Sequence, residues 1–194
     1  MRILLLRHAA TAWTATGQHT GRTDLALTEA GEIEARATAP LFAEMLGKDT
    51  LAAIYSSPRQ RVLRTVELVV GRTAGVVTDE ALGEVNYGDF EGLTPAQIQE
   101  RAPGWWLWND GCPGGETLAQ VKARVDGFIQ NLRAVHREDT VCVGSHGHLS
   151  RAFCARLLGM PLEAAGAFAI STCAIADFTQ KDGRFLLSAW NRTR

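Results

Sequence analysis

The chain has 194 residues, 46% of them hydrophobic, which suits a single domain over residues 1–194 with a sizeable core. Its formal net charge of −1 gives no reason to expect nucleic acid or a membrane as a partner, and no apolar run approaches the roughly 18 residues of a membrane span. The segment before Arg7 is too short for a signal peptide and the four cysteines form no C-x-x-C pair, so we expect reduced thiols and a cytoplasmic location.

Apolar runs typical of strands alternate along the chain with segments typical of helices. The strands are expected at residues 2–6, 52–56, 76–78, 140–144, 172–178 and 184–190. The helices are expected at residues 29–46, 58–70, 95–101, 118–135 and 149–158, with capping boxes starting at Thr94 and Thr117 and a stop at Gly159. This alternation predicts an α/β three-layer sandwich, with a mostly parallel central sheet of about six strands and helices on both faces.

Arginine and histidine side chains follow the first expected strand and a late one. Arg7 and His8 come directly after residues 2–6, and His146 and His148 follow residues 140–144. Open α/β sheets bind ligands beyond the carboxyl ends of their strands. Guanidinium and imidazole groups suit a tetrahedral anion there. A zinc pair formed by His146 and His148 is the alternative, although no carboxylate follows at ligand spacing.

The segment after the second expected strand predicts a helix start. Ser57 is the expected N-cap, Pro58 suits the first helical position, and Gln60 completes a capping box. Cations in a first helical turn oppose the helix dipole, so Arg59 and Arg61 indicate an anionic ligand. The alternative is a pair of solvated arginines.

Residues 82–92 are rich in glycine, aromatic and acidic residues and predict an ordered, irregular loop. One carboxylate from Glu84, Asp89 or Glu91 near the cationic site could act as a general acid. A structural salt bridge is the alternative for each of them.

Together these segments resemble the histidine phosphatase superfamily, the phosphoglycerate mutase-like proteins. The family's Arg-His-Gly appears as Arg7-His8-Ala9, its Ser-Pro-x-x-Arg as residues 57–61, its glutamate loop as residues 84–92, its Gly-Gly-Glu-Ser as residues 114–117 and its Ser-His-Gly as residues 145–147. Residues 87–92 and 105–116 look like the acid phosphatase and sedoheptulose bisphosphatase branch. Two positions depart from the family pattern: Ala9 replaces a glycine, and Thr14 replaces an asparagine that helps to hold phosphate in relatives.

The resemblance implies two-step hydrolysis of a phosphomonoester, of the sugar phosphate or bisphosphate class, without metal or other cofactor. His8 would form a phosphohistidine, Arg7, Arg61 and His146 would hold the phosphoryl oxygens, and Glu84 would protonate the leaving group and then activate water. The candidates for substrate binding are Thr14, Thr20, Gly21, Arg22, Arg59, Glu116, Gly147 and His148.

Two other function classes remain open at this point: a phosphoglycerate mutase and a non-catalytic phospholigand-binding protein. Arg101 is the only basic residue between Glu84 and Lys122, which argues against a mutase that must retain a bisphosphate. The closely spaced tryptophans form either a wall over a small substrate or a mixture of core and surface positions; they are Trp105, Trp106 and Trp108. His19, a polar residue on a loop, is a candidate for the pocket lining, and a position outside the pocket is the alternative. The expected partner is a small phosphate ester, and a homo-oligomer remains open.

Overall fold

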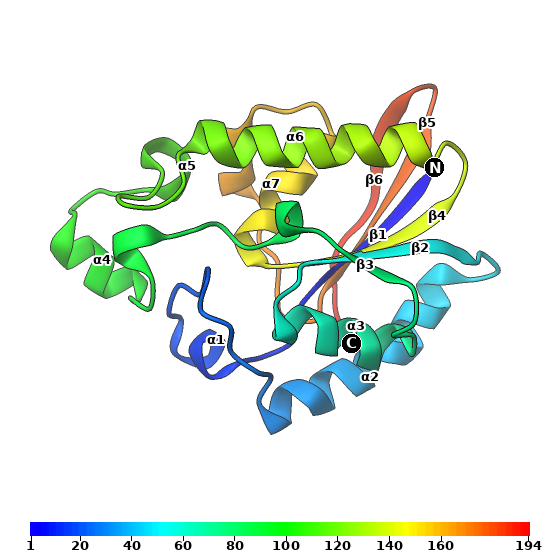
Figure 1. Cartoon of the computed structure of the whole chain (residues 1–194), viewed down its shortest axis with the longest axis horizontal. Coiled ribbons are helices and arrows are strands. Elements are labelled where there is room, and N and C mark those ends of the chain that lie inside the picture. Colours follow the sequence, from blue (N-terminus) through cyan, green and yellow to red (C-terminus); the bar gives the residue numbers. More distant parts are fainter.

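A six-stranded sheet with the order β3-β2-β4-β1-β5-β6 forms the middle layer of the computed structural model, which describes residues 1–194 (Figure 1). The strands β1 to β4 pair in parallel, whereas β5 and β6 extend the sheet in antiparallel fashion at one edge. The predicted fold class is therefore confirmed. The strands are β1 (Arg2–Arg7), β2 (Leu51–Ser56), β3 (Val76–Thr78), β4 (Thr140–Ser145), β5 (Ile175–Lys181) and β6 (Arg184–Arg192).

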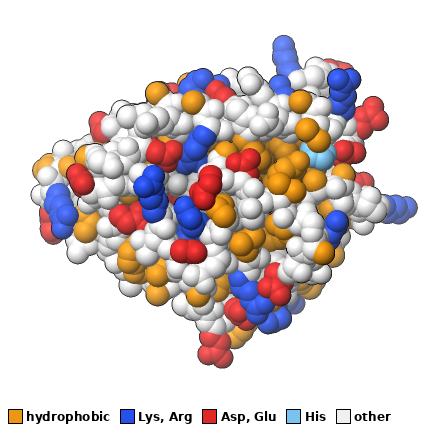
Figure 2. Space-filling view, in the orientation of Figure 1, with side chains coloured by type: hydrophobic (Ala, Val, Ile, Leu, Met, Phe, Trp, Pro, Cys, Tyr) orange, Lys and Arg blue, Asp and Glu red, His pale blue; other side chains and the backbone are white.

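Helices cover both faces of this sheet, with α6 and α7 on one side and α2 and α3 on the other (Figure 1). The helices are α1 (Ala12–Thr16), α2 (Glu29–Leu46), α3 (Gln60–Val70), α4 (Pro95–Arg101), α5 (Leu107–Asp110), α6 (Leu118–Val135) and α7 (Gly147–Leu157). No helix combines the length and the hydropathy that crossing a membrane requires. Acidic and basic side chains are interleaved on the face seen in Figure 2, in keeping with the near-neutral charge.

The central strand β1 contributes to two cores, because successive strand residues point to opposite faces of a sheet. Ile3 and Leu5 pack in the core formed with α6 and α7, and Leu4 and Leu6 pack in the core formed with α2 and α3. Burial on both faces explains why β1 and β4 are nearly continuous apolar runs rather than alternating ones. At Gly144 in β4, a Cβ would lie 2.7 Å from a methyl group of Val66, so the glycine allows α3 to approach the sheet closely.

The start of α3 differs from the prediction. The helix begins at Gln60, its N-cap is Arg59, and no side chain caps it in the usual way. The predicted capping box is wrong because Asp24, which is distant in sequence, supplies the cap: its Oδ1 accepts from the backbone N–H of Gln60 at 2.9 Å. The hydroxyl of Ser57 is thereby left for another partner.

Other boundaries shift by a few residues. The strand predicted from residue 172 begins at Ile175, because Cys173 has a positive φ of 51° that a strand cannot contain. Helix α7 begins at Gly147, two positions before the predicted start, and the short helices α1 and α5 were not expected. The capping boxes at Thr94 and Thr117 are confirmed, and Gly159 after α7 has the expected left-handed conformation.

Candidate active site

The carboxyl ends of β1 and β4 open into a cavity of about 600 Å³. The parallel register places Arg7 opposite Ser145, so the segments that follow the two strands meet at this edge. The wall of the cavity contains these residues that the sequence analysis singled out: Arg7, His8, Thr14, Thr20, Glu84, Gly147 and His148.

His8 is only 4% exposed, and its Nδ1 lies 2.8 Å from the carbonyl oxygen of Ala9. Because a carbonyl oxygen can only accept, Nδ1 carries the ring proton and Nε2 keeps its lone pair. Burial, followed by the positive charges of Arg7 and Arg61, lowers the pKa of His8 well below its ordinary value. His8 is therefore a neutral imidazole with a free nitrogen, the form that a nucleophile or a base requires.

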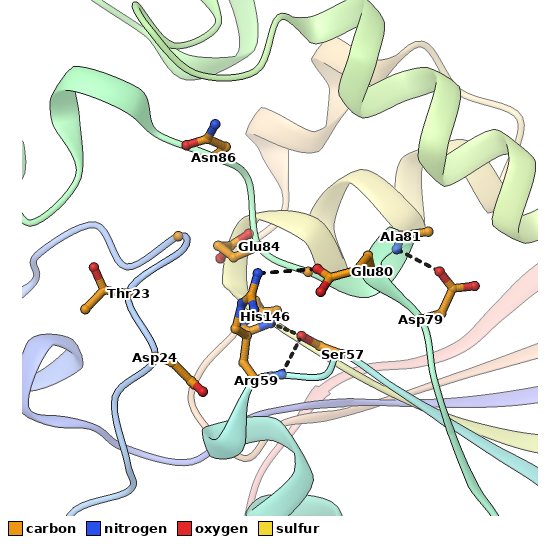
Figure 3. A network of polar contacts seen from close by, with 12 residues as sticks. Thr23, Asp24, Ser57, Arg59, Asp79, Glu80, Ala81, Glu84, Asn86 and His146 are labelled. Carbon is orange, nitrogen blue, oxygen red and sulfur yellow. Dashed lines mark hydrogen bonds and ion pairs between the residues drawn. The ribbon is translucent and has the colours of Figure 1, made fainter.

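His146 is fully buried at the N-cap of α7, and its ring centroid lies 5.3 Å from that of His8. Figure 3 shows its Nε2 against the hydroxyl of Ser57, at 2.8 Å, while the same hydroxyl accepts from the backbone N–H of Arg59 at 3.4 Å. Ser57 can therefore donate to Nε2, which leaves the proton of His146 on Nδ1, a buried atom without a partner. Burial, and then Arg61, lowers the pKa of His146 well below its ordinary value.

Arg7 and Arg61 bring two cations to this end of the sheet. Arg7 donates from Nη1 to the carbonyl of Ile170 at 2.5 Å. The Nη atoms of Arg61, which is fully buried, donate to the backbone carbonyls of Thr20, Gly21 and Thr23. Burial lowers the pKa of both arginines, and the Nε of each is buried without a partner. Each guanidinium group thus keeps an unused buried donor. Arg7 lines the cavity, whereas Arg61 and His146 are buried next to it and are not part of its wall.

Glu84 places a carboxylate at the N-terminus of α7. Its Oε1 accepts from the backbone N–H groups of Val85 and Leu149, at 3.0 and 2.8 Å, and its Oε2 accepts from that of His148 at 3.0 Å. The positive end of the helix dipole favours a negative charge there. The loop around Glu84 is irregular, as predicted, with single 3-10 turns at Glu80–Leu82 and Gly88–Phe90.

The outer part of the cavity is aromatic. The Nδ1 of His148 lies 2.5 Å from the hydroxyl of Tyr87, and the ring of His19 stacks on His148 with the centroids 5.5 Å apart. Burial lowers the pKa of both histidines and raises that of Tyr87, so all three are neutral. Trp105, Trp106 and Trp108 line the same cavity.

The two expectations for the tryptophans are each met in part. Trp108 is a core residue, 1% exposed, whereas Trp106 is 48% exposed. The Nε1 of Trp105 donates to the carbonyl of Gly111 at 2.8 Å, which fixes the segment between α4 and α6. All three nevertheless reach the cavity wall.

Four of the residues expected to bind substrate lie outside the cavity wall: Gly21, Arg22, Arg59 and Glu116. Arg22 is exposed, and Arg59 pairs with Glu80 at 3.3 Å (Figure 3). Glu116 pairs with Arg124 at 2.7 Å and accepts from the backbone N–H of Asn86, so it fastens the loop that carries Glu84. The N–H of Gly21 donates to the carboxylate of Glu91, which explains the glycine: a Cβ would lie 2.7 Å from that carboxylate.

The two departures from the family pattern are accommodated locally. Ala9 does not adopt a positive φ, so its methyl group causes no backbone strain. Thr14 lines the cavity, but its hydroxyl donates to the carbonyl of Thr11 and accepts from the N–H of the same residue, each at 2.8 Å. The hydroxyl of Thr14 is thus already engaged in the capping box of α1.

Histidine and carboxylate side chains do not converge as metal ligands do: no group of three or more potential ligands is formed. His146 and His148, the expected zinc pair in one interpretation, are hydrogen-bonded to different partners, Ser57 and Tyr87.

The sequence analysis did not single out several residues of the cavity wall, above all Tyr87, Arg151 and the segment at residues 166–170. Arg151 shares one face of α7 with Gly147, four positions before it, but the helix predicted from residue 149 left Gly147 out and so hid this signal. Residues 166–170 carried none, because they reach the cavity only through tertiary folding.

Residues 3–193 match the sequence model of the histidine phosphatase superfamily (branch 1). The chain belongs to this family. It is 42% identical to an acid phosphatase of Mycobacterium tuberculosis over 90% of this chain and 84% of that protein. It is 33% identical to a sedoheptulose 1,7-bisphosphatase of Saccharomyces cerevisiae over 84% of this chain and 69% of that protein.

A solved structure of an open reading frame product from Mycobacterium tuberculosis superposes with a TM-score of 0.92 at 38% identity, covering 99% of this chain and 97% of that one. The resemblance seen in the sequence is therefore confirmed, and with it the class of enzyme. This histidine phosphatase is a phosphoric monoester hydrolase.

Proposed function

We propose that this histidine phosphatase hydrolyses small phosphorylated metabolites, of the sugar phosphate or sugar bisphosphate class, through a phosphohistidine on His8 and without a metal ion. The observation that carries the proposal is the state of His8. Its Nδ1 is fixed to the carbonyl of Ala9, its pKa is lowered by burial, and its Nε2 remains available in a cavity that Arg7 also lines.

In the first step, Nε2 of His8 attacks phosphorus, a nitrogen–phosphorus bond forms and the ester oxygen–phosphorus bond breaks. Charge develops on the phosphoryl oxygens in a loose, in-line transition state. Three unpartnered buried donors support the stabilisation of that charge: Nε of Arg7, Nε of Arg61 and Nδ1 of His146. These charged and dipolar groups stabilise the negative charge on the phosphoryl oxygens, which a metal ion stabilises in other phosphatases.

In its protonated form Glu84 gives its proton to the departing alkoxide, and the carboxylate that this leaves, which the three backbone N–H groups stabilise, then takes a proton from the attacking water. The water oxygen bonds to phosphorus, the nitrogen–phosphorus bond breaks, and His8 returns to its neutral form. General acid–base catalysis of this kind typically contributes about 10²–10⁴-fold. Glu84 is supported in this role because it lines the cavity, whereas Glu116 is paired with Arg124 outside it.

The names of the relatives support a phosphatase for small metabolites, since one is an acid phosphatase and another a sedoheptulose bisphosphatase. The test is a screen of phosphate release from sugar phosphates, sugar bisphosphates, phosphoglycerates and nucleotides, with the purified chain after prolonged EDTA treatment. We expect net phosphate release that survives the treatment. Exchange of phosphate between positions without net release would indicate a mutase, and binding without either reaction would indicate a non-catalytic protein.

A further inference from the structure

A carboxylate of α2 reaches the segment that carries His8, and phosphoryl transfer as described does not use it. Oε2 of Glu34 accepts from the backbone N–H of Ala10 at 3.0 Å, and this N–H has no other acceptor. Oε1 of the same carboxylate accepts from the hydroxyl of Thr172, in the segment before β5. Both oxygens of Glu34 are therefore held in place, one of them on the backbone two positions after His8.

The N–H of Ala10 and the carbonyl of Ala9 belong to one peptide group. In a trans peptide these two bonds point in opposite directions, and the carbonyl of Ala9 lies 2.8 Å from Nδ1 of His8. Two hydrogen bonds thus connect the carboxylate of Glu34, through this peptide, to the imidazole. Because bonds in such a chain polarise one another, the negative charge at one end makes the carbonyl a stronger acceptor at the other.

This chain of hydrogen bonds has two consequences for His8. A fixed carbonyl keeps the ring proton on Nδ1 and the ring in one orientation, so that Nε2 retains its lone pair. A more polarised carbonyl also draws the Nδ1 proton closer and raises the electron density on Nε2. Serine hydrolases obtain both effects from a carboxylate bonded directly to the histidine, whereas here one peptide group lies between the two.

Glu34 is the one charged side chain that bonds the backbone of residues 8–10. The N–H of Ala9, by comparison, donates to the neutral hydroxyl of Thr65 at 3.0 Å. The charge of Glu34 also acts on the neighbouring Arg7: burial lowers the pKa of that arginine most, and Glu34 is among the negative charges that oppose the decrease. The carboxylate is therefore placed to act electrostatically on the nucleophile segment.

We propose that Glu34 is a positioning residue: through the Ala9–Ala10 peptide it fixes the tautomer and the orientation of His8 and increases the nucleophilicity of Nε2. The inference rests on the proposed function, because it takes His8 as the nucleophile. Glu34 is not part of the cavity wall, so it acts on the substrate only through the imidazole.

The test compares two variants at position 34. Glu34→Ala removes the acceptor for the N–H of Ala10, whereas Glu34→Gln keeps an amide oxygen for it and removes the charge. For Glu34→Ala we expect the pre-steady-state burst with p-nitrophenyl phosphate to slow by about tenfold to a hundredfold, since a small misplacement of a reacting group can cost about 10²-fold. Glu34→Gln should restore part of the rate, and a native rate in it would overturn the role of the charge.

Two readouts separate positioning from a merely structural role. The inhibition constant of inorganic phosphate should stay native in both variants, because the groups that hold the phosphoryl oxygens are unchanged. The nitrogen NMR chemical shifts of the His8 ring should show the Nδ1–H tautomer in the native chain and a mixture of tautomers in Glu34→Ala. Partial unfolding alone would lower Tm and the burst amplitude, and would leave the burst rate per active site and the tautomer unchanged.

Two controls locate the effect. Glu32→Gln is the matched control on the same helix, because Glu32 pairs with Arg36 and Arg64 outside the active-site cavity, and it should keep the native burst rate. Thr172→Val removes the other bond of Glu34 and leaves the bond to Ala10. We expect it to slow the burst less than Glu34→Ala does, and equal slowing would assign the effect to the segment of Thr172 and contradict the inference.

The remaining outcomes distinguish this inference from the proposed function. A native burst rate and a native tautomer in Glu34→Ala overturn the inference and leave His8 as the nucleophile. An inhibition constant for phosphate that rises as the burst rate falls also overturns it, because Glu34 would then act through Arg7. Absence of a burst and of any phosphohistidine in the native chain overturns the proposed function, and this inference with it.

Discussion

Removing the hydroxyl of Ser57 should weaken the enzyme through His146. In the native structure Ser57 is fully buried, and its Oγ lies 2.8 Å from Nε2 of His146, which is fully buried as well. Ser57→Ala leaves Nε2 without a donor, and a buried polar atom left unsatisfied costs about 1–3 kcal/mol. For a chain of this length that cost corresponds to a decrease in Tm of roughly 2–12 °C.

The effect on activity follows from the position of the proton on His146. Without the serine donor, the ring can move its proton from Nδ1 to Nε2 and thereby lose the Nδ1–H donor that we assign to a phosphoryl oxygen. Removing one such donor typically lowers kcat by about 10²–10³. Because the ring of His146 stays in place and can still populate the native tautomer, we expect a loss of about tenfold to a hundredfold in kcat/KM.

The assay combines thermal unfolding with steady-state hydrolysis of p-nitrophenyl phosphate. Ser56→Ala is the matched control, since Ser56 is equally buried and its Oγ donates at 2.9 Å to the carbonyl of Ser57 rather than to His146. We expect it to lower stability by about 1 kcal/mol and to keep kcat/KM. The reasoning is refuted if Ser57→Ala retains native kcat/KM, or if both variants lose activity in proportion to their stability.

Three further predictions concern Glu84, pH and metal. Glu84→Gln should release nitrophenol from p-nitrophenyl phosphate in a near-normal first turnover and then stall, whereas the first turnover with a sugar phosphate slows by about 10²–10⁴-fold; equal loss for both substrates in a pre-steady-state burst would show that Glu84 is not the proton donor. Because the pKa values of His8, His146 and His148 are lowered from 6.5, the unfolded chain binds protons that the folded chain does not. Stability should therefore fall as pH drops below about 6.5, by up to about 1.4 kcal/mol per pH unit for each histidine, and a flat unfolding free energy between pH 7.5 and pH 5.5 would contradict this. Activity should survive dialysis against EDTA, and its loss with recovery on adding Zn²⁺ or Mg²⁺ would favour a metal site.

The sequence predicted the sheet well because its strands carry their own signal. The runs that became β1 and β4 are apolar on both faces, and each ends in the histidine segment that the fold delivers to one edge. The capping boxes at Thr94 and Thr117 were equally local, since a threonine and a glutamine three positions apart suffice to form them.

Long-range contacts explain what the sequence did not predict. The start of α3 depends on Asp24, and the hydroxyl expected to cap it bonds His146 instead. Glu116 was expected in the pocket, but its carboxylate pairs with Arg124 of α6 at 2.7 Å, and this ion pair holds it outside the cavity wall. Partner choices of this kind are made by packing between segments, so motif spacing alone does not determine them.

The most direct test of the account is to locate the phosphate in the trapped intermediate. The native chain would be mixed with a phosphate-labelled substrate, denatured at alkaline pH within the first turnover, digested and mapped. The account predicts label on His8, and neither label nor turnover in His8→Ala, while His136→Ala, which changes a histidine that bonds Tyr55 and Asp139 away from the cavity, keeps both. Label on His146, or substantial turnover by His8→Ala, would contradict it.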